Sequence, residues 1–461
     1  MNESTMTSTT TSHASPRASL AAIGALLRQR NVFAPVREQL TIAQKTVKYT
    51  PTDKLYDGLI ALLAGAHGLV EVNTRLRSDL ALQQAFGRTA CAEQSVIQQT
   101  LDACTAENVQ QMEQALAQIY RQHSQGSQHD YQQRLQVLDA DMSGLPCGKK
   151  AAFATKGYFA RQRNRQGRQL GRVVASHYDE VVVDRVFAGA TQLVRALPAL
   201  MVAAEQTLDL DIAKRALTIV RIDAGGGSLD DLNWLLSRSY QVMAKDYSST
   251  RAAHLAASVV RWVDDPRIAG RQIGYVTLEA TEYARPVVRV AVRCRKRNGQ
   301  WGIGVLISTI DPSTIVTLTE LSPSEWVHPD AELLAYVYFY DGRGGGVETS
   351  LKGDKQGLGM TKRNKKRFEA QQMLTLLGSL AHNLIVWARG WLQLEQPKLR
   401  HYGILRMVRD VLQISGRLIV DGVGHLVTIV LNQAVPLAPG LVAALARLLA
   451  PAHIVVTLGE I

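Results

Sequence analysis

The sequence predicts an α/β protein that begins with a helical domain and contains a β-rich insertion. Three observations support this fold class. Residues 20–129 place apolar side chains three and four positions apart, as amphipathic helices do. From Leu135 onward, strand-like segments alternate with two helical segments, which is typical of an α/β sheet. Residues 276–320 then form a run of strand-like segments without helices between them, which indicates an insertion.

Length and composition exclude several classes of protein. The 461 residues are enough for two or three domains, and 46% hydrophobic with 20% charged residues does not fit a disordered or collagenous chain. Four cysteines without a C-x-x-C pair exclude a disulfide framework and a thiolate zinc site. Polar residues and prolines interrupt the longest apolar stretches, so we expect no membrane span. No export signal is evident either, and we expect a cytoplasmic protein.

The first 130 residues are expected to form a tail and a helical domain. Residues 1–18 are rich in Ser and Thr, which predicts a disordered tail. Residues 19–130 are expected to form a helical N-terminal domain that binds DNA ends, with helices starting after Pro51, over residues 92–103 and over residues 106–122. Basic and acidic residues balance in this domain, so its charge alone does not indicate DNA binding. 

The rest of the chain is expected to form a divided α/β core. Its first part is residues 131–250, with strands in LQVLDAD, RVVASHYDEVVVDRVF, ALTIVRID and YQVMAKDY, and helices over 191–208 and 229–236. The β-rich insertion is residues 251–330, with strands expected in VTLEATEY, PVVRVAVRCRKR, WGIGVLIST and TIVTLTEL. Residues 331–395 return to helix and carry a long apolar stripe over 368–392. Residues 396–461 are expected to form a C-terminal α/β region.

Positive charge is concentrated in three segments. Residues 156–172, 285–297 and 343–367 each carry a net charge of +6, whereas the whole chain carries +12. The remainder is therefore net negative, and clustered Lys and Arg favour a polyanion such as DNA. The alternative is that each cluster is only a solvated face. The residues that we expect to bind DNA in the first and third segments are Arg161, Arg163 and Arg165, and Lys362, Arg363, Lys365, Lys366 and Arg367.

Two aspartates follow apolar strand-like segments. Asp141 ends VLDAD and Asp223 ends ALTIVRID, each just before a predicted turn. Because sites in open α/β sheets lie beyond strand ends, these carboxylates are expected to converge. Carboxylates without Cys or His partners favour Mg²⁺. Asp139 lies on the same strand face as Asp141, so spacing alone does not choose between them, and each Asp could instead only start a turn.

A third acid lies in a predicted helix. Glu348 is followed four and seven residues later by Lys352 and Lys355, which share its helical face. One interpretation is a surface ion pair between Glu348 and Lys352. The functional interpretation places Glu348 on a metal ion and Lys355 on a phosphate.

The order Asp141, Asp223, Tyr340, Arg343, Glu348, Lys355 resembles that of the DDE transposases of bacterial insertion sequences. It is most similar to the subgroup with a β-strand insertion before the glutamate and a Y-R-E-K signature. The gaps from Tyr340 to Arg343 and from Glu348 to Lys355 match that signature. Four residues separate Arg343 from Glu348, where the family usually has three. The resemblance covers roughly residues 52–435, and its motifs are specific only together.

The resemblance implies an RNase H-like catalytic core. Asp141 would lie on the first strand, Asp223 just after the fourth and Glu348 on a helix, together holding two Mg²⁺ ions, for which Mn²⁺ could substitute. The implied activity is cut-and-paste transposition, with element ends and target DNA as partners, no membrane and a homodimer in the DNA complex. The implied location is the bacterial cytoplasm, in association with the nucleoid.

The same resemblance gives one tryptophan of the insertion a role. Trp301 would stack a base flipped out during hairpin formation at the element end. The alternative is an ordinary strand residue, and Trp262 and Trp326 are weaker candidates for the same role.

Two other functions remain open. The chain could be an inactive or domesticated DNA-binding protein, or a metal-dependent nuclease that cuts without rejoining. No P-loop or H-E-x-x-H motif is present, and His382 on the apolar helix is interpreted as a core residue and not as a ligand.

Overall fold

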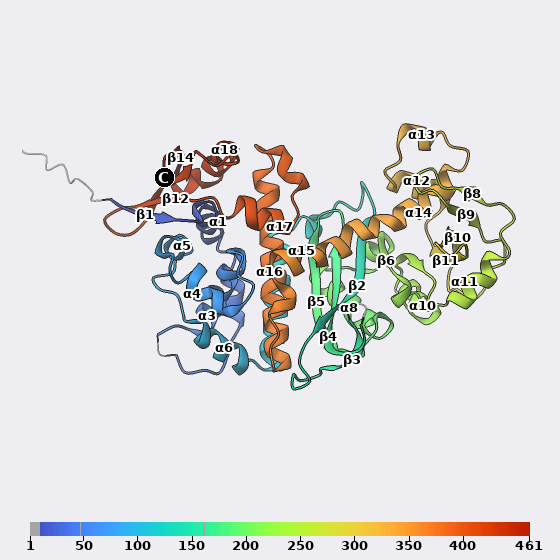
Figure 1. Ribbon diagram of the computed structural model, residues 1–461, viewed down its shortest axis with the longest axis horizontal. Helices are drawn as coiled ribbons and strands as arrows, with labels where there is room; N and C mark the ends of the chain where they lie inside the picture. Colours follow the sequence, from blue (N-terminus) through green and yellow to red (C-terminus); the bar gives the residue numbers. More distant parts are fainter. Residues whose placement is uncertain (1–9, 47, 160–161) are drawn as a thin grey trace, which may run out of the picture. The chain divides into compact units, whose positions relative to one another are not determined.

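The computed structural model (Figure 1) describes residues 10–46, 48–159 and 162–461 and shows a mixed α/β protein. Its chain forms two compact units, each of which is described by itself. The sheet unit consists of Gln125–Pro146 and Phe153–Ser350. The helical unit consists of Met1–Ser124, Cys147–Ala152 and Leu351–Ile461.

The centre of the sheet unit is a mixed sheet of five strands, in the order β5-β4-β2-β6-β7. β4 pairs antiparallel with both β2 and β5, while β6 pairs parallel with β2 and with β7. β2, β4 and β5 therefore form an antiparallel meander. The two short parallel strands extend the sheet on the other side of β2, first β6 and then β7. The bounds are β2 Gln136–Pro146, β4 Gln162–Ala175, β5 Glu180–Ala188, β6 Thr218–Ile222 and β7 Gln241–Lys245.

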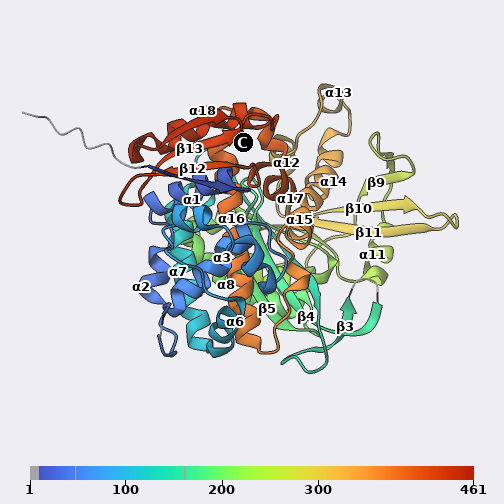
Figure 2. The same cartoon turned by 60° about the vertical axis from the view of Figure 1, so that its left-hand side comes forward.

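The insertion continues this sheet and does not form a sheet of its own. β11 pairs antiparallel with β7, and β10, β9 and β8 follow in that order. Figure 2 shows β10 and β11 as a two-stranded ribbon that runs out from the rest of the sheet unit. A short strand, β3, pairs with the first residues of β4. The bounds are β3 Thr155–Phe159, β8 Val263–Asp264, β9 Arg271–Tyr275, β10 Val288–Arg295 and β11 Trp301–Ser308.

Two strands expected in the insertion are wrong. TIVTLTEL lies largely in helix α12 (Pro312–Leu318), because Asp311 accepts a hydrogen bond from the Thr314 amide and Pro312 occupies the first turn. These start signals override the strand preference of the β-branched residues. VTLEATEY follows β9 as a loop, to which Arg289 donates hydrogen bonds at the carbonyls of Leu278 and Glu279.

Helices cover both faces of the central strands. On one face, α8 packs closely: a Cβ on Gly171 of β4 would come within 2.8 Å of Leu200. On the other face, α14 packs its buried residues against Val137, Ile219 and Met243 of three neighbouring strands. The helices of this unit are α8 Leu193–Leu208, α9 Ile212–Ala216, α10 Leu229–Ser237, α11 Ser249–Ala256, α12, α13 Pro323–Trp326 and α14 Ala331–Arg343.

The helical unit is built around the long apolar helix α16 (Phe368–Leu392), which contacts α3, α6 and α7. None of the helices in the described part of the chain is long and apolar enough to cross a membrane. The other helices are α1 Ala18–Gln29, α2 Ala34–Gln39, α3 Pro51–Leu63, α4 Val72–Arg75, α5 Leu80–Ala85, α6 Gln94–Ala103, α7 Ala106–His123, α17 Ile404–Arg406 and α18 Ala438–Leu449, and α15 (Thr349–Gly357) joins the two units.

The first and last strands of the described chain lie in one small sheet of the helical unit, with strand order β1-β12-β13-β14. Its strands are β1 Thr11–Ser15, β12 Gly416–Val420, β13 Leu426–Asn432 and β14 Val455–Gly459. The predicted disordered tail over 1–18 is therefore wrong from Thr11 onward, while residues 1–9 lie outside the described residues. β1 forms because β12 offers it a free edge, and Ser15 donates a hydrogen bond to Asp79 at 2.7 Å. 

The units also differ from the expected division into domains. The N-terminal residues and residues 396–461 share one unit, and α16 belongs to this unit although we expected it to end the α/β core. The boundary falls between Ser350 and Leu351, inside a continuous helix. Helix periodicity gives no sign of such a boundary, because the pattern of the helix does not change there.

Candidate active site

Strand register places the two aspartates side by side. β2 and β6 run parallel and stay paired up to Ala140 and Ile222, so Asp141 and Asp223 follow at the same level. The prediction that Asp141 ends its strand is wrong. β2 continues past Asp141 to Pro146 and stays paired with β4. β6 is the strand that ends there, and its end leaves the side of Asp141 open.

Asp141 is held by two contacts. Its Oδ1 accepts a hydrogen bond from the Met142 amide at 2.7 Å, and its Oδ2 lies 3.0 Å from Nη2 of Arg343. Burial raises the pKa of Asp141 to about 6; the guanidinium of Arg343 opposes this rise, and the charges of Asp223 and Glu348 add to it. The carboxyl group therefore lies close to both other acids.

Asp223 fits both interpretations of an acid after a strand. Its Oδ1 accepts a hydrogen bond from the Gly225 amide at 2.8 Å and caps the 3₁₀ turn Ala224–Gly226. Its negative charge also contributes to the raised pKa values of Asp141 and Arg343. The turn contact therefore orients a carboxylate that faces the other acids.

Glu348 is brought to the same place by a π-helical turn. α14 ends at Arg343, and residues Gly344–Glu348 form a π turn before α15 begins. In a π turn the hydrogen bonds join residues five apart, so Arg343 and Glu348 share a side. Nη1 of Arg343 lies 3.1 Å from Oε1 of Glu348. The π turn thus accommodates the extra residue between Arg343 and Glu348.

Gly346 allows this turn to lie directly on β2. A Cβ at this position would come within 2.4 Å of Oδ2 of Asp139, which no ordinary contact allows. Asp139 is fully buried and accepts hydrogen bonds from Nε and Nη2 of Arg221 at 2.6 and 2.8 Å and from Ser176 at 2.5 Å. Its contacts are those of a supporting residue, whereas Asp141 faces Arg343.

Arg343 and Tyr340 lie among the acids and not on an open DNA-binding surface. Arg343 is 3% exposed, and its Nη2 also donates to the carbonyl of Ala140 at 3.4 Å. Tyr340 is half-buried. Burial raises the pKa of its phenol, Arg343 opposes the rise, and the charges of Asp223, Glu348 and Asp141 add to it. Sequence reasoning selected both residues, but their burial depends on the helix that carries them.

Other residues predicted for the site lie elsewhere. Lys355 is half-buried on the part of α15 that belongs to the helical unit. Trp301 begins β11 and is 37% exposed, and the guanidinium of Arg293 lies 4.6 Å from its ring centroid and 4.1 Å from that of Trp262. Trp326, on α13, is 50% exposed. The Trp301 side chain is therefore accessible at the outer end of the ribbon.

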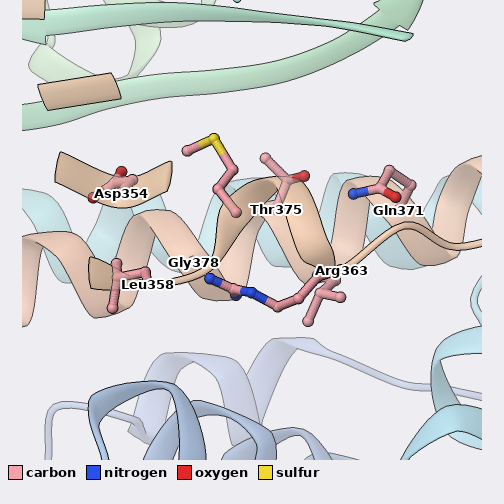
Figure 3. Close-up of a pocket in the computed structure, with 8 residues that line it drawn as sticks. Asp354, Leu358, Arg363, Gln371, Thr375 and Gly378 are labelled. Carbon is pink, nitrogen blue, oxygen red and sulfur yellow. The ribbon is translucent and has the colours of Figure 1, made fainter. Parts of the chain in front are cut away.

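The basic run 362–367 is not a uniform surface. Arg363 is buried and lines a cavity of about 20 Å³ beside Gly378 of α16 (Figure 3), and burial lowers its pKa to about 10. Lys365 is half-buried, with Nζ donating to Gln98 at 2.6 Å. The exposed members of the run are Lys362, Lys366 and Arg367. The backbone turns between these positions, which a sequence pattern does not reveal.

Two more expectations concern single residues. His382 is buried with its Nδ1 2.7 Å from Oδ1 of Asp354, as a core histidine with a polar partner would be. Arg165 is exposed on β4, while Arg161 and the side chain of Arg163 lie outside the described residues.

The three acids are of the residue type that binds a divalent ion. They offer only carboxylate oxygens, the ligands that Mg²⁺ prefers. Across the described ranges, no group of three or more His, Cys, Asp or Glu side chains is arranged to hold a metal ion. Arg343 bonds Asp141 and Glu348, so an ion would compete with its guanidinium for their oxygens.

A buried ion pair next to the acids escaped sequence reasoning. Arg172 lies directly across from Asp141 in the β2–β4 register and binds Asp184 of β5 at 2.6 Å. Both residues interrupt otherwise apolar strand segments, and that interruption was the available signal.

Comparison with known proteins places few limits on the function. No protein-family model and no curated protein matches the chain. One solved structure that it resembles is the cryo-EM structure of the piggyBac transposase synaptic complex with hairpin DNA, at a TM-score of 0.44 and 10% sequence identity. The similarity covers 95% of this chain and 84% of that chain. The function proposed below rests on the site geometry and not on this likeness.

Proposed function

We propose that this protein is a DNA transposase, a metal-dependent phosphoryl-transfer enzyme that cuts DNA and joins it to a target. One observation carries the proposal: Asp141, Asp223 and Glu348 converge from two parallel strands and one helical turn around Arg343. Carboxylate oxygens are the ligands that a divalent ion such as Mg²⁺ prefers, and the net positive charge of the chain suits a polyanion.

The fold that we propose for the sheet unit is RNase H-like. Three antiparallel strands come first in the chain and two parallel strands are added beside the first of them, giving the order β5-β4-β2-β6-β7. The acids occupy the first strand, the end of the fourth and a later helical turn, as the sequence resemblance implies. This agreement between strand order and acid placement supports the proposal.

Each side chain has a distinct task in the reaction. Bound Mg²⁺ would activate a water or a DNA 3′-hydroxyl and stabilise the leaving oxygen. Asp141 and Glu348 each hold one carboxylate oxygen against Arg343, at Nη2 and at Nη1. Asp223 is kept in place by its hydrogen bond to the Gly225 amide. Arg343 offsets the negative charge that these acids and an approaching phosphate concentrate in one place.

We further propose that the substrate is the end of a bacterial insertion sequence, moved by cut and paste. The β10–β11 ribbon carries Arg293, Arg295, Lys296 and Arg297, and Trp301 is exposed near its tip. A two-stranded ribbon with basic side chains can approach the DNA backbone, and an exposed indole can stack a flipped base. We propose a homodimer on DNA, since the two element ends must be held together.

The proposal is tested with DNA that contains the sequences flanking the gene for this protein. The purified protein should nick this DNA in Mg²⁺ and then join it to a second duplex. Cutting without joining would identify a nuclease instead. Binding without cutting, in Mg²⁺ and in Mn²⁺, would identify an inactive DNA-binding protein and overturn the proposal.

A further inference from the structure

Arg172 forms a buried junction between three elements of the sheet unit. Its side chain is 0% exposed, and its Nε and Nη2 donate to the two carboxylate oxygens of Asp184 at 2.8 and 2.6 Å. The remaining nitrogen, Nη1, donates to Oγ of Ser350 at 2.8 Å. β4, β5 and the first turn of α15 are therefore joined through one guanidinium.

This junction lies beside the acids. Arg172 is directly opposite Asp141 across the β2–β4 pairing, and Asp184 is directly opposite Arg172 across β4–β5. On one face of the sheet, Asp184, Arg172 and Asp141 thus follow one another across β5, β4 and β2, and Asp223 comes directly after β6. Ser350, bound at this row, lies two residues after Glu348.

A buried ion pair is a poor way to gain stability alone. Removing two charges from water costs several kcal/mol per ion, and an apolar pair of similar volume often serves the fold as well. A bidentate Arg–carboxylate pair does, however, fix the guanidinium plane, because two parallel hydrogen bonds define its orientation. This orientation fixes the position of Nη1, and one of its N–H groups reaches Oγ of Ser350.

We propose that Arg172 and Ser350 are positioning residues that fix the backbone on which Glu348 is mounted. Glu348 is 59% exposed at its side chain and has little packing of its own. Two residues before it, Gly346 lies against Asp139; two residues after it, Ser350 is bonded to Arg172. The backbone at Glu348 is clamped on both sides to neighbouring strands, so the carboxylate keeps its place opposite Asp141.

The proposal rests on the proposed function for its effect on metal binding and DNA cleavage. Residues that orient a metal ligand through hydrogen bonds change metal affinity or activity by about 10- to 100-fold when removed. We therefore expect Ser350→Ala to weaken Mn²⁺ binding and slow DNA cleavage by about that factor. Ser350→Thr keeps the hydroxyl and should restore both.

The test compares Ser350→Ala with a matched control, Ser308→Ala. Ser308 is also a buried serine of the sheet unit, but its hydroxyl accepts a hydrogen bond from a backbone amide, that of Ile310, and not from a guanidinium. Mn²⁺ affinity is measured by electron paramagnetic resonance, and amide hydrogen exchange is followed over residues 344–352. We expect weaker Mn²⁺ binding and faster exchange in Ser350→Ala only.

The outcomes separate this inference from the proposed function. Unchanged exchange over 344–352 in Ser350→Ala, or an equal effect in Ser308→Ala, overturns the positioning role. If the unmodified protein binds no Mn²⁺ and cuts no DNA, the proposed function fails, and the exchange measurement still decides whether Arg172 anchors the turn through Ser350. If exchange rises but Mn²⁺ affinity does not change, the anchor exists without positioning Glu348, and the inference is wrong.

Discussion

Arg343 and Glu348 form an ion pair at 3.1 Å although they lie five positions apart in the sequence, because the turn between them is π-helical. In a regular α-helix, side chains three or four positions apart are neighbours, and a residue five positions on would lie away from its partner. The local backbone thus returns Glu348 to the side where Asp141 lies. This turn makes the site sensitive to a change at Gly346, which lies against Asp139.

Replacing Gly346 should damage the site, whereas replacing its neighbour should not. A methyl group at Gly346 would approach Oδ2 of Asp139 to 2.4 Å, and one at Gly345 would meet nothing within 4 Å. We expect Gly346→Ala to lower the free energy of unfolding by about 1–3 kcal/mol and to depress cleavage. Gly345→Ala should leave both nearly unchanged. Urea unfolding and DNA cleavage measured on both variants decide this, and equal effects would contradict the packing of the turn on β2.

Asp139 and Asp141 should respond to substitution in opposite ways. Asp139→Ala leaves Arg221 buried without its carboxylate, which should cost about 3–5 kcal/mol of folding free energy. Asp141→Ala should cost much less stability and remove cleavage, because Asp141 faces the open side of the site. Chemical unfolding gives the first quantity for both variants. A stable Asp139→Ala protein that has lost all cleavage would reverse the assignment.

Lys365 should act on stability and not on DNA affinity. Burial lowers its pKa to about 8, the charge of Asp102 opposes this and that of Arg363 adds to it. Between pH 8 and the ordinary pKa of 10.5, the unfolded chain binds more protons at Lys365 than the folded chain does, so the free energy of unfolding rises with pH over this range. Below pH 8 the buried charge of Lys365 destabilises the folded state by its full amount.

Lys365→Met should therefore raise the melting temperature at pH 7, with a gain that shrinks toward pH 10.5. Its DNA affinity should keep the salt dependence of the unmodified protein. Lys366→Met, at an exposed position, is the control and should flatten the log-log salt slope by about 0.9 if it contacts one phosphate. A flatter slope for Lys365→Met would show that Lys365 reaches DNA after all.

Trp301 tests the role of the ribbon. Because its side chain is 37% exposed, Trp301→Ala should cost much less than the roughly 3–5 kcal/mol of a buried tryptophan. If the indole receives a flipped base, the first nick should persist while the later hairpin product declines. Trp326→Ala, also at an exposed position, is the control and should leave both products unchanged. A large fall in melting temperature with equal loss of both products would assign Trp301 to the fold.

Much of the sheet could be predicted from the sequence, because buried strands and their turns are local patterns. The segments around Asp141 and Asp223 and the two helices between strands appear where their apolar periodicity placed them. β1 could not be predicted, since TSHAS has no strand-like alternation and forms only because β12 accepts it. Long-range pairing of this kind leaves no local signal.

The candidate site was predictable as a set of residue types but not as an arrangement. The acids and Arg343 could be selected by order and spacing. The π turn that joins Arg343 to Glu348 could not, because it lies where Gly346 packs against Asp139 of a distant strand. For Arg363 and Lys365 the residue type itself led to a wrong prediction of surface exposure. They lie in a basic run that resembles a DNA-binding surface, but their burial is a property of the tertiary structure.

The central claim is that Asp141, Asp223 and Glu348 together hold the metal ions that cut DNA. The most direct measurement is Mg²⁺-dependent nicking of the gene-flanking DNA by Asp141→Asn, Asp223→Asn and Glu348→Gln, with DNA affinity measured alongside. We predict that each variant binds DNA as the unmodified protein does but loses nicking entirely. Retained nicking in any one of the three variants would contradict the claim.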